Sequence, residues 1–362
     1  MNNDNKSKDL DMDMSWQGNK NKVDSIENTK KGNWFYRIYL YQKEMYPILS
    51  RLILGLIVFA EIYFIVLLNS GATLNFSTLE INMAVPTGGY SDGMLWDGVV
   101  LEAVGKLSIQ ELVGAFTVFS FLFWLRIADD FKDYELDCKM FPHRPLPSGR
   151  VTHKDLKILL WILIPITLAL NLVFMNNFIF CFILYTYGSL MAIWFFQKHK
   201  IAKSLPLALV THNPVQMIMN IYIISFVVIK YKPFVNPFSI YSIMAVFTLY
   251  FPALIWEVTR KIRAPKDETE YTTYSKLFGY KKATNFAMIV TWIDIITNFI
   301  LVWNLSKISV LILFLLVSWM TLKFIQFKKD PTRFKLVDMV ERYTYLQESI
   351  MLLTVILVLI TQ

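Results

Sequence analysis

YPILSRLILGLIVFAEIYFIVLL, residues 46–68, is an apolar run whose only charged side chains are Arg51 and Glu61. At a rise of about 1.5 Å per residue, a helix of this length crosses the roughly 30 Å of hydrocarbon in a bilayer. Eight further blocks have the same character: residues 109–127, 156–174, 178–196, 205–229, 238–256, 286–303, 308–327 and 343–360. The sequence therefore predicts an all-α integral membrane protein with nine transmembrane helices.

The composition agrees with lipid as the main solvent. The chain has 362 residues, of which 55% are hydrophobic and only 18% charged, so a soluble fold would expose too much apolar surface. The net charge of +8 is explained by membrane topology and by the anionic inner leaflet, so no nucleic-acid partner is expected. Cys138 and Cys181 are too few and too differently placed for a disulfide framework or a zinc site.

The positions of Lys and Arg predict the orientation, because these residues are retained on the cytoplasmic side. With the N-terminus inside, 31 of the 36 cations fall in cytoplasmic segments, and four, Lys106, Lys230, Lys232 and Lys307, fall outside. The N-terminus is then cytoplasmic and the C-terminus external. We expect residues 1–32 to form a disordered cytoplasmic tail, because they lack apolar periodicity, and the aromatic-rich residues 33–45 to form an interfacial helix.

The chemistry is concentrated after the second span, in RIADDFKDYELDCKMFPHRPLPSGR, residues 126–150. Asp129, Asp133 and Asp137 are four residues apart, so on a continuing helix they form one stripe, and Asp130 lies on the same broad face. Like charges at this spacing repel one another, so the stripe indicates a bound cation. Mg²⁺ fits, because it is usually held by one or two carboxylates together with substrate phosphates.

A solvated loop whose acids balance its bases is the alternative interpretation of this segment. The shared register of the four aspartates and the turn-rich RPLPSGR that follows favour a metal site over which that turn folds back. The basic residues of the segment would neutralise further phosphate charge: they are Lys132, Lys139, Arg144 and Arg150.

These residues resemble the UbiA superfamily of intramembrane prenyltransferases. The first motif of that family is N-D-x-x-D-x-x-x-D, followed by a basic residue and R-P-L-P-S-G; here Asp129 replaces the leading Asn and Arg144 begins RPLPSG. The resemblance extends over residues 46–362, since nine helices with the N-terminus inside is also the architecture of the family. It implies a helical bundle with a central cavity and the metal ligands Asp129, Asp130, Asp133 and Asp137.

The second acidic motif of the family, D-x-x-x-D, is altered in this chain. WEVTRKIRAPKDETEYTTYSKLFG, residues 256–279, supplies Glu257 at the first acidic position but Lys261 at the second. Two interpretations remain open. In the first, one of Asp267, Glu268 and Glu270 replaces the missing aspartate. In the second, a group of cations binds the diphosphate directly. These cations are Arg260, Lys261, Arg263 and Lys266. Glu257 is a candidate metal ligand where another acid completes the motif; where cations replace that acid, Glu257 orients them, and its four-residue spacing predicts a pair with Lys261 across one helical turn.

Polar residues inside and beside the spans are further candidates for substrate binding. His212, Gln216 and Asn220 stand four apart on one face of the fifth span, next to Asn213. An acceptor pocket and interhelical hydrogen bonding explain them equally well. Lys200 and Lys203, with Tyr187 one turn or more before them, lie where the family has a basic segment, although cytoplasmic placement alone also accounts for the lysines.

The resemblance implies Mg²⁺-dependent transfer of an isoprenoid group from a polyprenyl diphosphate to an aromatic or other lipophilic acceptor, with loss of diphosphate. The site would face the cytoplasm from the cell (inner) membrane. An intramembrane terpene cyclase of the same superfamily would ionise the same donor but give a different product. A transporter or degenerate relative is a third possibility, but the charge lies in loops rather than in helices broken at the middle of the bilayer.

Overall fold

The computed structural model describes residues 32–86, 89–91, 94–96, 99–268 and 272–361. The predicted tail, apart from Gly32, and Glu270 therefore lie outside the described residues. Within them, eight helices are long and apolar enough to cross a membrane, and a further apolar helix, α7 (Phe178–Ala192), has 15 residues. The prediction of a mostly helical, multi-pass membrane protein is confirmed.

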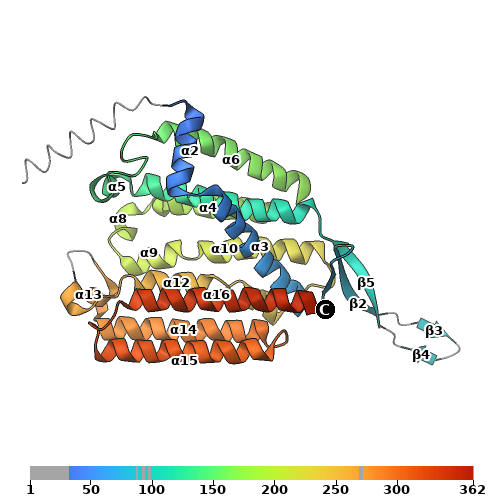
Figure 1. The fold of residues 1–362 in the computed structure, drawn as a ribbon. Coiled ribbons are helices and arrows are strands. Elements are labelled where there is room, and N and C mark those ends of the chain that lie inside the picture. Colours follow the sequence, from blue (N-terminus) through green and yellow to red (C-terminus); the bar gives the residue numbers. More distant parts are fainter. Residues whose placement is uncertain (1–31, 87–88, 92–93, 97–98, 269–271, 362) are drawn as a thin grey trace, which may run out of the picture. The chain divides into compact units, whose positions relative to one another are not determined.

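The chain divides into two compact units; Figure 1 labels the helices and strands of which they consist. Unit 1 contains the described residues up to Leu54 and residues Phe119–Thr167; unit 2 contains Gly55–Val118 and Leu168–Gln362. Three long helices pass from one unit into the other: α3 (Ile48–Asn69), α4 (Ile109–Lys132) and α6 (His153–Phe174).

Unit 1 is held together by contacts to α2 (Trp34–Met45), which covers most of the predicted interfacial segment. The ring of Tyr46, just after α2, stacks on Phe123 of α4 with centroids 4.6 Å apart. Arg37 donates two hydrogen bonds of 2.8 and 2.7 Å to the carboxylate of Asp155 on α6. These contacts fix α2 against two helices that the sequence places about 80 to 120 residues away.

Unit 2 is organised around α14 (Tyr280–Val302). This helix packs against α15 (Lys307–Lys329), against α16 (Leu336–Thr361) and against three shorter helices, α11 (Ile240–Ala245), α12 (Tyr250–Thr259) and α13 (Tyr274–Phe278). α14 and α16 begin several residues before the predicted apolar segments 286–303 and 343–360, so each helix is longer than its apolar segment. The C-terminal residues of α12 and α15 and the N-terminal residues of α14 and α16 gather at one end, named here the motif end.

Two of the predicted spans are interrupted. The fifth consists of α9 (Leu205–His212) and α10 (Val215–Lys230), separated at Asn213 and Pro214, and the sixth of α11 and α12. Both ranges are nevertheless long and apolar enough to cross a membrane, as the predicted spans over 205–229 and 238–256 require. The span predicted over 178–196 also ends early, at Ala192, and is followed by the short turn helix η1 (Trp194–Phe196) and α8 (Lys198–Ile201).

Asn220 supplies the hydrogen bonds that the break between α11 and α12 leaves unmade. Its amide donates to the carbonyl of Val246 at 2.9 Å and also reaches the carbonyls of Ala245 and Thr248. The last carbonyls of any helix have no partner within it, and in hydrocarbon an unpaired carbonyl costs several kcal/mol. Asn220 is fully buried, so its role here is to satisfy the broken backbone.

The connection between α3 and α4 forms strands, which the sequence analysis did not predict. β1 (Thr73–Asn75), β2 (Glu80–Pro86) and β5 (Val99–Lys106) make an antiparallel sheet, and β3 (Gly89–Ser91) pairs with β4 (Met94–Trp96).

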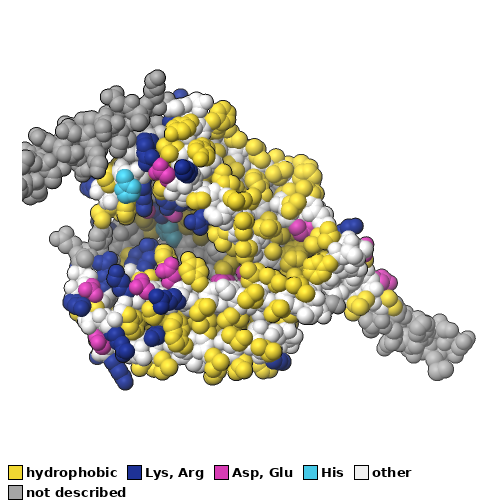
Figure 2. Space-filling model, viewed as in Figure 1, with side chains coloured by type: hydrophobic (Ala, Val, Ile, Leu, Met, Phe, Trp, Pro, Cys, Tyr) yellow, Lys and Arg dark blue, Asp and Glu magenta, His cyan; other side chains and the backbone are white. Residues whose placement is uncertain are grey.

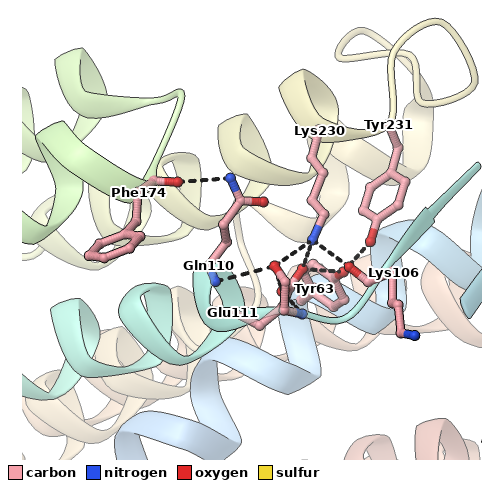
Figure 3. Close-up of polar contacts among 8 residues, drawn as sticks. Tyr63, Lys106, Gln110, Glu111, Phe174, Lys230 and Tyr231 are labelled. Atoms are coloured by element: carbon pink, nitrogen blue, oxygen red, sulfur yellow. Dashed lines mark hydrogen bonds and ion pairs between the residues drawn. The ribbon is translucent and has the colours of Figure 1, made fainter. Parts of the chain in front are cut away.

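The base of this hairpin is fixed by a polar cluster (Figure 3). The carboxylate of Glu111 pairs with the Lys230 ammonium and accepts a 2.9 Å hydrogen bond from Tyr63. The hydroxyls of Tyr63 and Tyr231 are 2.6 Å apart, and the Lys230 ammonium also donates to the carbonyl of Lys106 at 2.9 Å. The cluster therefore links α3, α4 and α10 to the end of β5.

The surface of unit 2 follows the pattern expected of helices in lipid. Figure 2 shows hydrophobic side chains along the sides of α14, α15 and α16, whereas Lys and Arg gather at the motif end, near α13. At the opposite ends of these helices, α15 begins with Lys307, whose ammonium lies over the ring of Trp303.

Candidate active site

The acidic stripe lies where α4 gives way to α5 (Tyr134–Met140), within unit 1. The amide of Asp133 donates to the carbonyl of Asp129, and that of Asp137 to the carbonyl of Asp133, both at 2.9 Å. Helical spacing therefore continues through the junction, although Asp133 is not itself helical and α5 is a separate helix. The three aspartates remain one turn apart, as the sequence predicted, on a helix that bends at Asp133.

Asp130 and Asp137 are the two buried aspartates of the stripe, and Asp130 is the more completely enclosed. Its carboxylate accepts a 2.5 Å hydrogen bond from the hydroxyl of Tyr41 on α2 and a 2.6 Å hydrogen bond from Arg126, one turn earlier on α4. Burial and the negative charge of Asp130 raise the pKa of Tyr41. Sequence reasoning missed both partners, and only the i, i+4 spacing of Arg126 could have indicated one of them.

Two of the remaining acids also have basic partners. Lys132 lies 3.0 Å from Asp129, and Arg144 lies 2.7 Å from Asp137 while its guanidinium covers the ring of Phe141 at 4.0 Å. The RPLPSGR segment thus reaches the stripe through Arg144.

Asp133 makes no ion pair with any residue that the structure describes. The residue is exposed, but the protein around its carboxyl partly desolvates it, and this raises the pKa of Asp133; the nearby charges of Asp129 and Asp137 add to the rise, while Lys132 and Arg126 oppose it. Among the four acids, Asp133 therefore has the carboxylate that is most available to a new cation.

The turn after the stripe is fastened to α2. Arg150 donates two hydrogen bonds, of 2.6 and 2.8 Å, to the carboxylate of Glu44, and a third to the carbonyl of His143. Gly149 has a φ of +73°, a left-handed conformation that a Cβ would strain. Arg150 is thus engaged in holding the turn.

The donor set of the stripe is compatible with Mg²⁺. Within the described ranges, no group of three or more Asp, Glu, His or Cys side chains is arranged to hold a metal ion. Magnesium, however, is held by one or two carboxylates when phosphate oxygens complete its shell. The carboxylates of the stripe offer oxygen ligands of this kind, and two of them are paired with Lys132 and Arg144 in the structure.

The second motif lies in unit 2, at the end of α12. Glu257 accepts a 2.5 Å hydrogen bond from Arg260 and pairs with Lys261 at 2.9 Å. The pairing of Glu257 with Lys261, which their four-residue spacing predicted, is present in the structure. Two cations therefore surround the one acid that this motif retains.

The loop after Lys261 is organised by hydroxyl groups. The carboxylate of Glu268 accepts hydrogen bonds from Thr273, at 2.7 Å, and from Ser275, and Ser275 also accepts the amide of Arg263 at 2.9 Å. Glu268 is thereby committed to its own loop. Of the three acids that could have replaced the missing aspartate, Asp267 lies instead in the wall of a cavity with Arg260, Arg263 and Lys266.

The other sequence candidates are distributed over α7 to α10. Tyr187 donates a 2.8 Å hydrogen bond to the carbonyl of Thr211, and the ring of His212 lies edge-on to Trp194, with centroids 5.1 Å apart. Gln216 donates to Asn220 at 3.2 Å. Interhelical bonding thus accounts for Asn220. The other predicted residues remain candidates for substrate binding: Tyr187, His212, Gln216, Asn213 and the exposed Lys200 and Lys203.

Glu61 and Asp294, the two isolated acids of the spans, are both buried in unit 2. Asp294 accepts a 3.1 Å hydrogen bond from Asn298, and Glu348, which the sequence analysis did not single out, lies within electrostatic range of both acids. Arg51, the one Lys or Arg that the sequence analysis left inside a span, lies over the ring of Tyr46 at 5.6 Å.

The fold and the site describe a multi-pass helical membrane protein with a charged motif at the end of a helix in each unit. The sequence profile of the UbiA prenyltransferase family matches residues 94–339, which is more than half of the chain. The chain belongs to this family.

A solved structure, described as digeranylgeranylglyceryl phosphate synthase in membranes, is similar with a TM-score of 0.60 and 15% identity, covering 90% of this chain and 100% of that one. At this identity the likeness concerns the fold. No curated protein sequence matches the chain.

The environments of the aspartates predict different effects on folding. Asp130→Asn leaves Arg126 and Tyr41 facing a weaker acceptor in a buried position, so we expect the free energy of unfolding to fall by about 1 to 3 kcal/mol. Asp133→Asn removes an exposed carboxylate without an ion pair, so its effect should be below about 0.5 kcal/mol. Thermal unfolding of both variants in the same detergent measures the difference, and equal midpoints would contradict it.

Proposed function

We propose that the protein is a Mg²⁺-dependent prenyltransferase that moves an isoprenoid group from a polyprenyl diphosphate to an aromatic or other lipophilic acceptor, releasing diphosphate. The observation that carries this proposal is the stripe of Asp129, Asp133 and Asp137, spaced by one turn at the end of a membrane helix in a chain of the UbiA family.

In this proposal each acid has a defined part. Asp129, Asp133 and Asp137 hold Mg²⁺, which neutralises the negative charge that grows on the departing diphosphate. Asp130 adds charge at the same site from a position fixed by Tyr41 and Arg126.

Lys132 and Arg144 would move from carboxylate to phosphate when the substrate binds. In the structure each neutralises one aspartate. Each cation stays paired during this exchange. The carboxylate would bind the metal ion, and a phosphate oxygen would replace the carboxylate oxygen as the partner of the cation.

The second motif acts as a cationic clamp in this proposal. Glu257 orients Arg260 and Lys261, whose guanidinium and ammonium groups bind the diphosphate. The commitment of Glu268 to Thr273 and Ser275 favours this account over a second magnesium ion held by Glu257 and Glu268.

We also propose that the membrane portion, residues 46–362, crosses the bilayer nine times, with α7 as the shortest span, after a cytoplasmic tail and the interfacial helix α2. The gathering of Lys and Arg at the motif end of unit 2 supports a cytoplasmic position for that end. The hairpin between α3 and α4 would then be external, and the active site would face the cytoplasm from the cell (inner) membrane.

This topology predicts the sides on which the two termini lie. A tag before Met1 should be cytoplasmic and one after Gln362 external, because an odd number of crossings separates them. Protease protection in sealed vesicles, or paired reporter fusions at the two ends, measures the result. Both tags on one side would exclude nine crossings.

The metal role of the stripe is tested by Asp133→Asn with Glu135→Gln as its matched control. Glu135 lies on the same short helix, α5, and is exposed, so its loss should leave activity within about twofold. Asp133→Asn should lower diphosphate release by at least about 100-fold, the size of effect seen when one stabilising group of a charged transition state is removed.

The measurement is release of diphosphate from labelled prenyl diphosphates in Mg²⁺ or EDTA, with the lipid product identified by mass. EDTA should abolish release by the unchanged protein. Full activity of Asp133→Asn, or activity that is equal in EDTA, would contradict the proposed site. A product that contains acceptor and prenyl group distinguishes a transferase from a cyclase, whose product contains the prenyl chain alone.

The clamp is tested at Lys261, with Lys281→Ala, an exposed lysine at the start of α14, as the control. Lys261→Ala should weaken prenyl diphosphate binding by about tenfold, because one charge-assisted contact is lost. Lys261→Asp places a second carboxylate beside Glu257 and should be less active than alanine. Initial rates against substrate concentration give the order, and an aspartate variant as active as the unchanged protein would favour a second metal ion instead.

A further inference from the structure

Tyr41 differs from the other aromatic residues of α2 because its side chain is fully buried. Phe35, Tyr36 and Tyr39 are all more than half exposed. Aromatic residues of an interfacial helix are expected at the boundary between lipid and water. Tyr41 does not lie there, so its presence on α2 has another physical reason.

The hydroxyl of Tyr41 holds one side of a buried carboxylate. It donates to Oδ2 of Asp130 at 2.5 Å, while Arg126 donates to Oδ1 of the same group at 2.6 Å. The side chain of Asp130 is only 5% exposed, so water does not readily replace either donor. The carboxylate is therefore held in one orientation, because turning it would break a hydrogen bond to a charged acceptor.

Asp130 lies among the acids proposed to hold magnesium. It directly follows Asp129 in the sequence, and its carboxylate lies within electrostatic range of Asp137 and Arg144. Its negative charge therefore acts on the metal-binding acids. Where that charge lies depends on the orientation that Tyr41 helps to impose.

Helix α2 is fixed on both sides of Tyr41. Arg37, Tyr41 and Glu44 are spaced by four and three residues, so they share one face of the helix. Arg37 donates two hydrogen bonds to Asp155, and Glu44 accepts two from Arg150. The hydroxyl of Tyr41 is thus presented by a helix that is fastened one turn before it and one turn after it.

We infer, on the basis of the proposed function, that Tyr41 is a positioning residue of the magnesium site. It acts through Asp130, whose carboxylate it holds in the orientation that keeps negative charge at the stripe. Helix α2 is then part of the active site as well as an interfacial helix. Loss of a hydrogen-bond partner of a carboxylate in a metal site lowers metal affinity or activity by about 10- to 100-fold.

The test compares three single substitutions on α2 in the full chain. Tyr41→Phe removes the hydroxyl and keeps the ring, which lies beside Phe123 with centroids 6.4 Å apart. Tyr39→Phe, the matched control, makes the same change at an exposed position. Arg37→Gln loosens α2 from α6 without removing a partner of Asp130, so it controls for the docking of the helix.

Metal binding is measured separately from catalysis. Mn²⁺, which takes the same oxygen ligands as Mg²⁺, is titrated by electron paramagnetic resonance with inorganic diphosphate present and with a protein-free blank. The Mg²⁺ concentration for half-maximal diphosphate release is measured in parallel. Tyr41→Phe should need about tenfold more metal in both experiments. Tyr39→Phe and Arg37→Gln should stay within about twofold, although Arg37→Gln should lower the midpoint of thermal unfolding.

A double-mutant cycle shows whether Tyr41 acts through Asp130. Asp130→Asn removes the charge that the hydroxyl orients, so adding Tyr41→Phe to it should change the metal requirement by less than about twofold. Three results would overturn the inference: equal losses in both backgrounds, an equal loss in Arg37→Gln, or Mn²⁺ binding by Tyr41→Phe that matches the unchanged protein.

The proposed reaction and this role of Tyr41 fail separately. If the unchanged protein binds Mn²⁺ but releases no diphosphate from prenyl diphosphates, the proposed reaction is wrong, and the Mn²⁺ titration of the variants still decides the role of Tyr41. If the unchanged protein binds no Mn²⁺, there is no metal site for Tyr41 to position, and both are contradicted.

Discussion

The architecture depends on the cost of an unpaired polar group in hydrocarbon. Helices satisfy the hydrogen bonds of their own backbone, and the interruption between α11 and α12 lies beside Asn220, whose amide donates to the freed carbonyls. The same cost places charged side chains at helix ends, where the motifs lie. Asn220 therefore has a structural purpose even though it lies among polar residues that resemble a binding pocket.

Charge balance explains how the stripe of aspartates exists before any substrate arrives. Four acids within eight residues would repel each other, but Arg126, Lys132 and Arg144 each neutralise one of them. The arrangement is stable and still leaves one negative charge in excess. Lys132 and Arg144, the partners of Asp129 and Asp137, are partly exposed rather than fully buried.

Local pattern predicted the helices, the spacing of Asp129, Asp133 and Asp137, and the pairing of Glu257 with Lys261, because each depends on residues within one or two turns. It could not predict the partner of Asp130, since Tyr41 is 89 residues away. The break before α12 was missed because Leu249, the left-handed residue beside it, carries no Gly or Pro signal. The cavity was missed because half of its wall, residues 331–337, contains no motif.

The two motifs, one in each unit, therefore have charge excesses of opposite sign among their own contacts. The stripe in unit 1 has one acid more than its basic partners and attracts a cation. The second motif in unit 2 has Glu257 between Arg260 and Lys261, one cation in excess, and attracts an anion. If both motifs carried the aspartates of the family pattern, each would need a bound metal ion before it could bind the negatively charged diphosphate. In the proposed clamp, Lys261 in place of the second aspartate supplies part of that positive charge covalently, so substrate would bind at the second motif without the free energy of metal binding there.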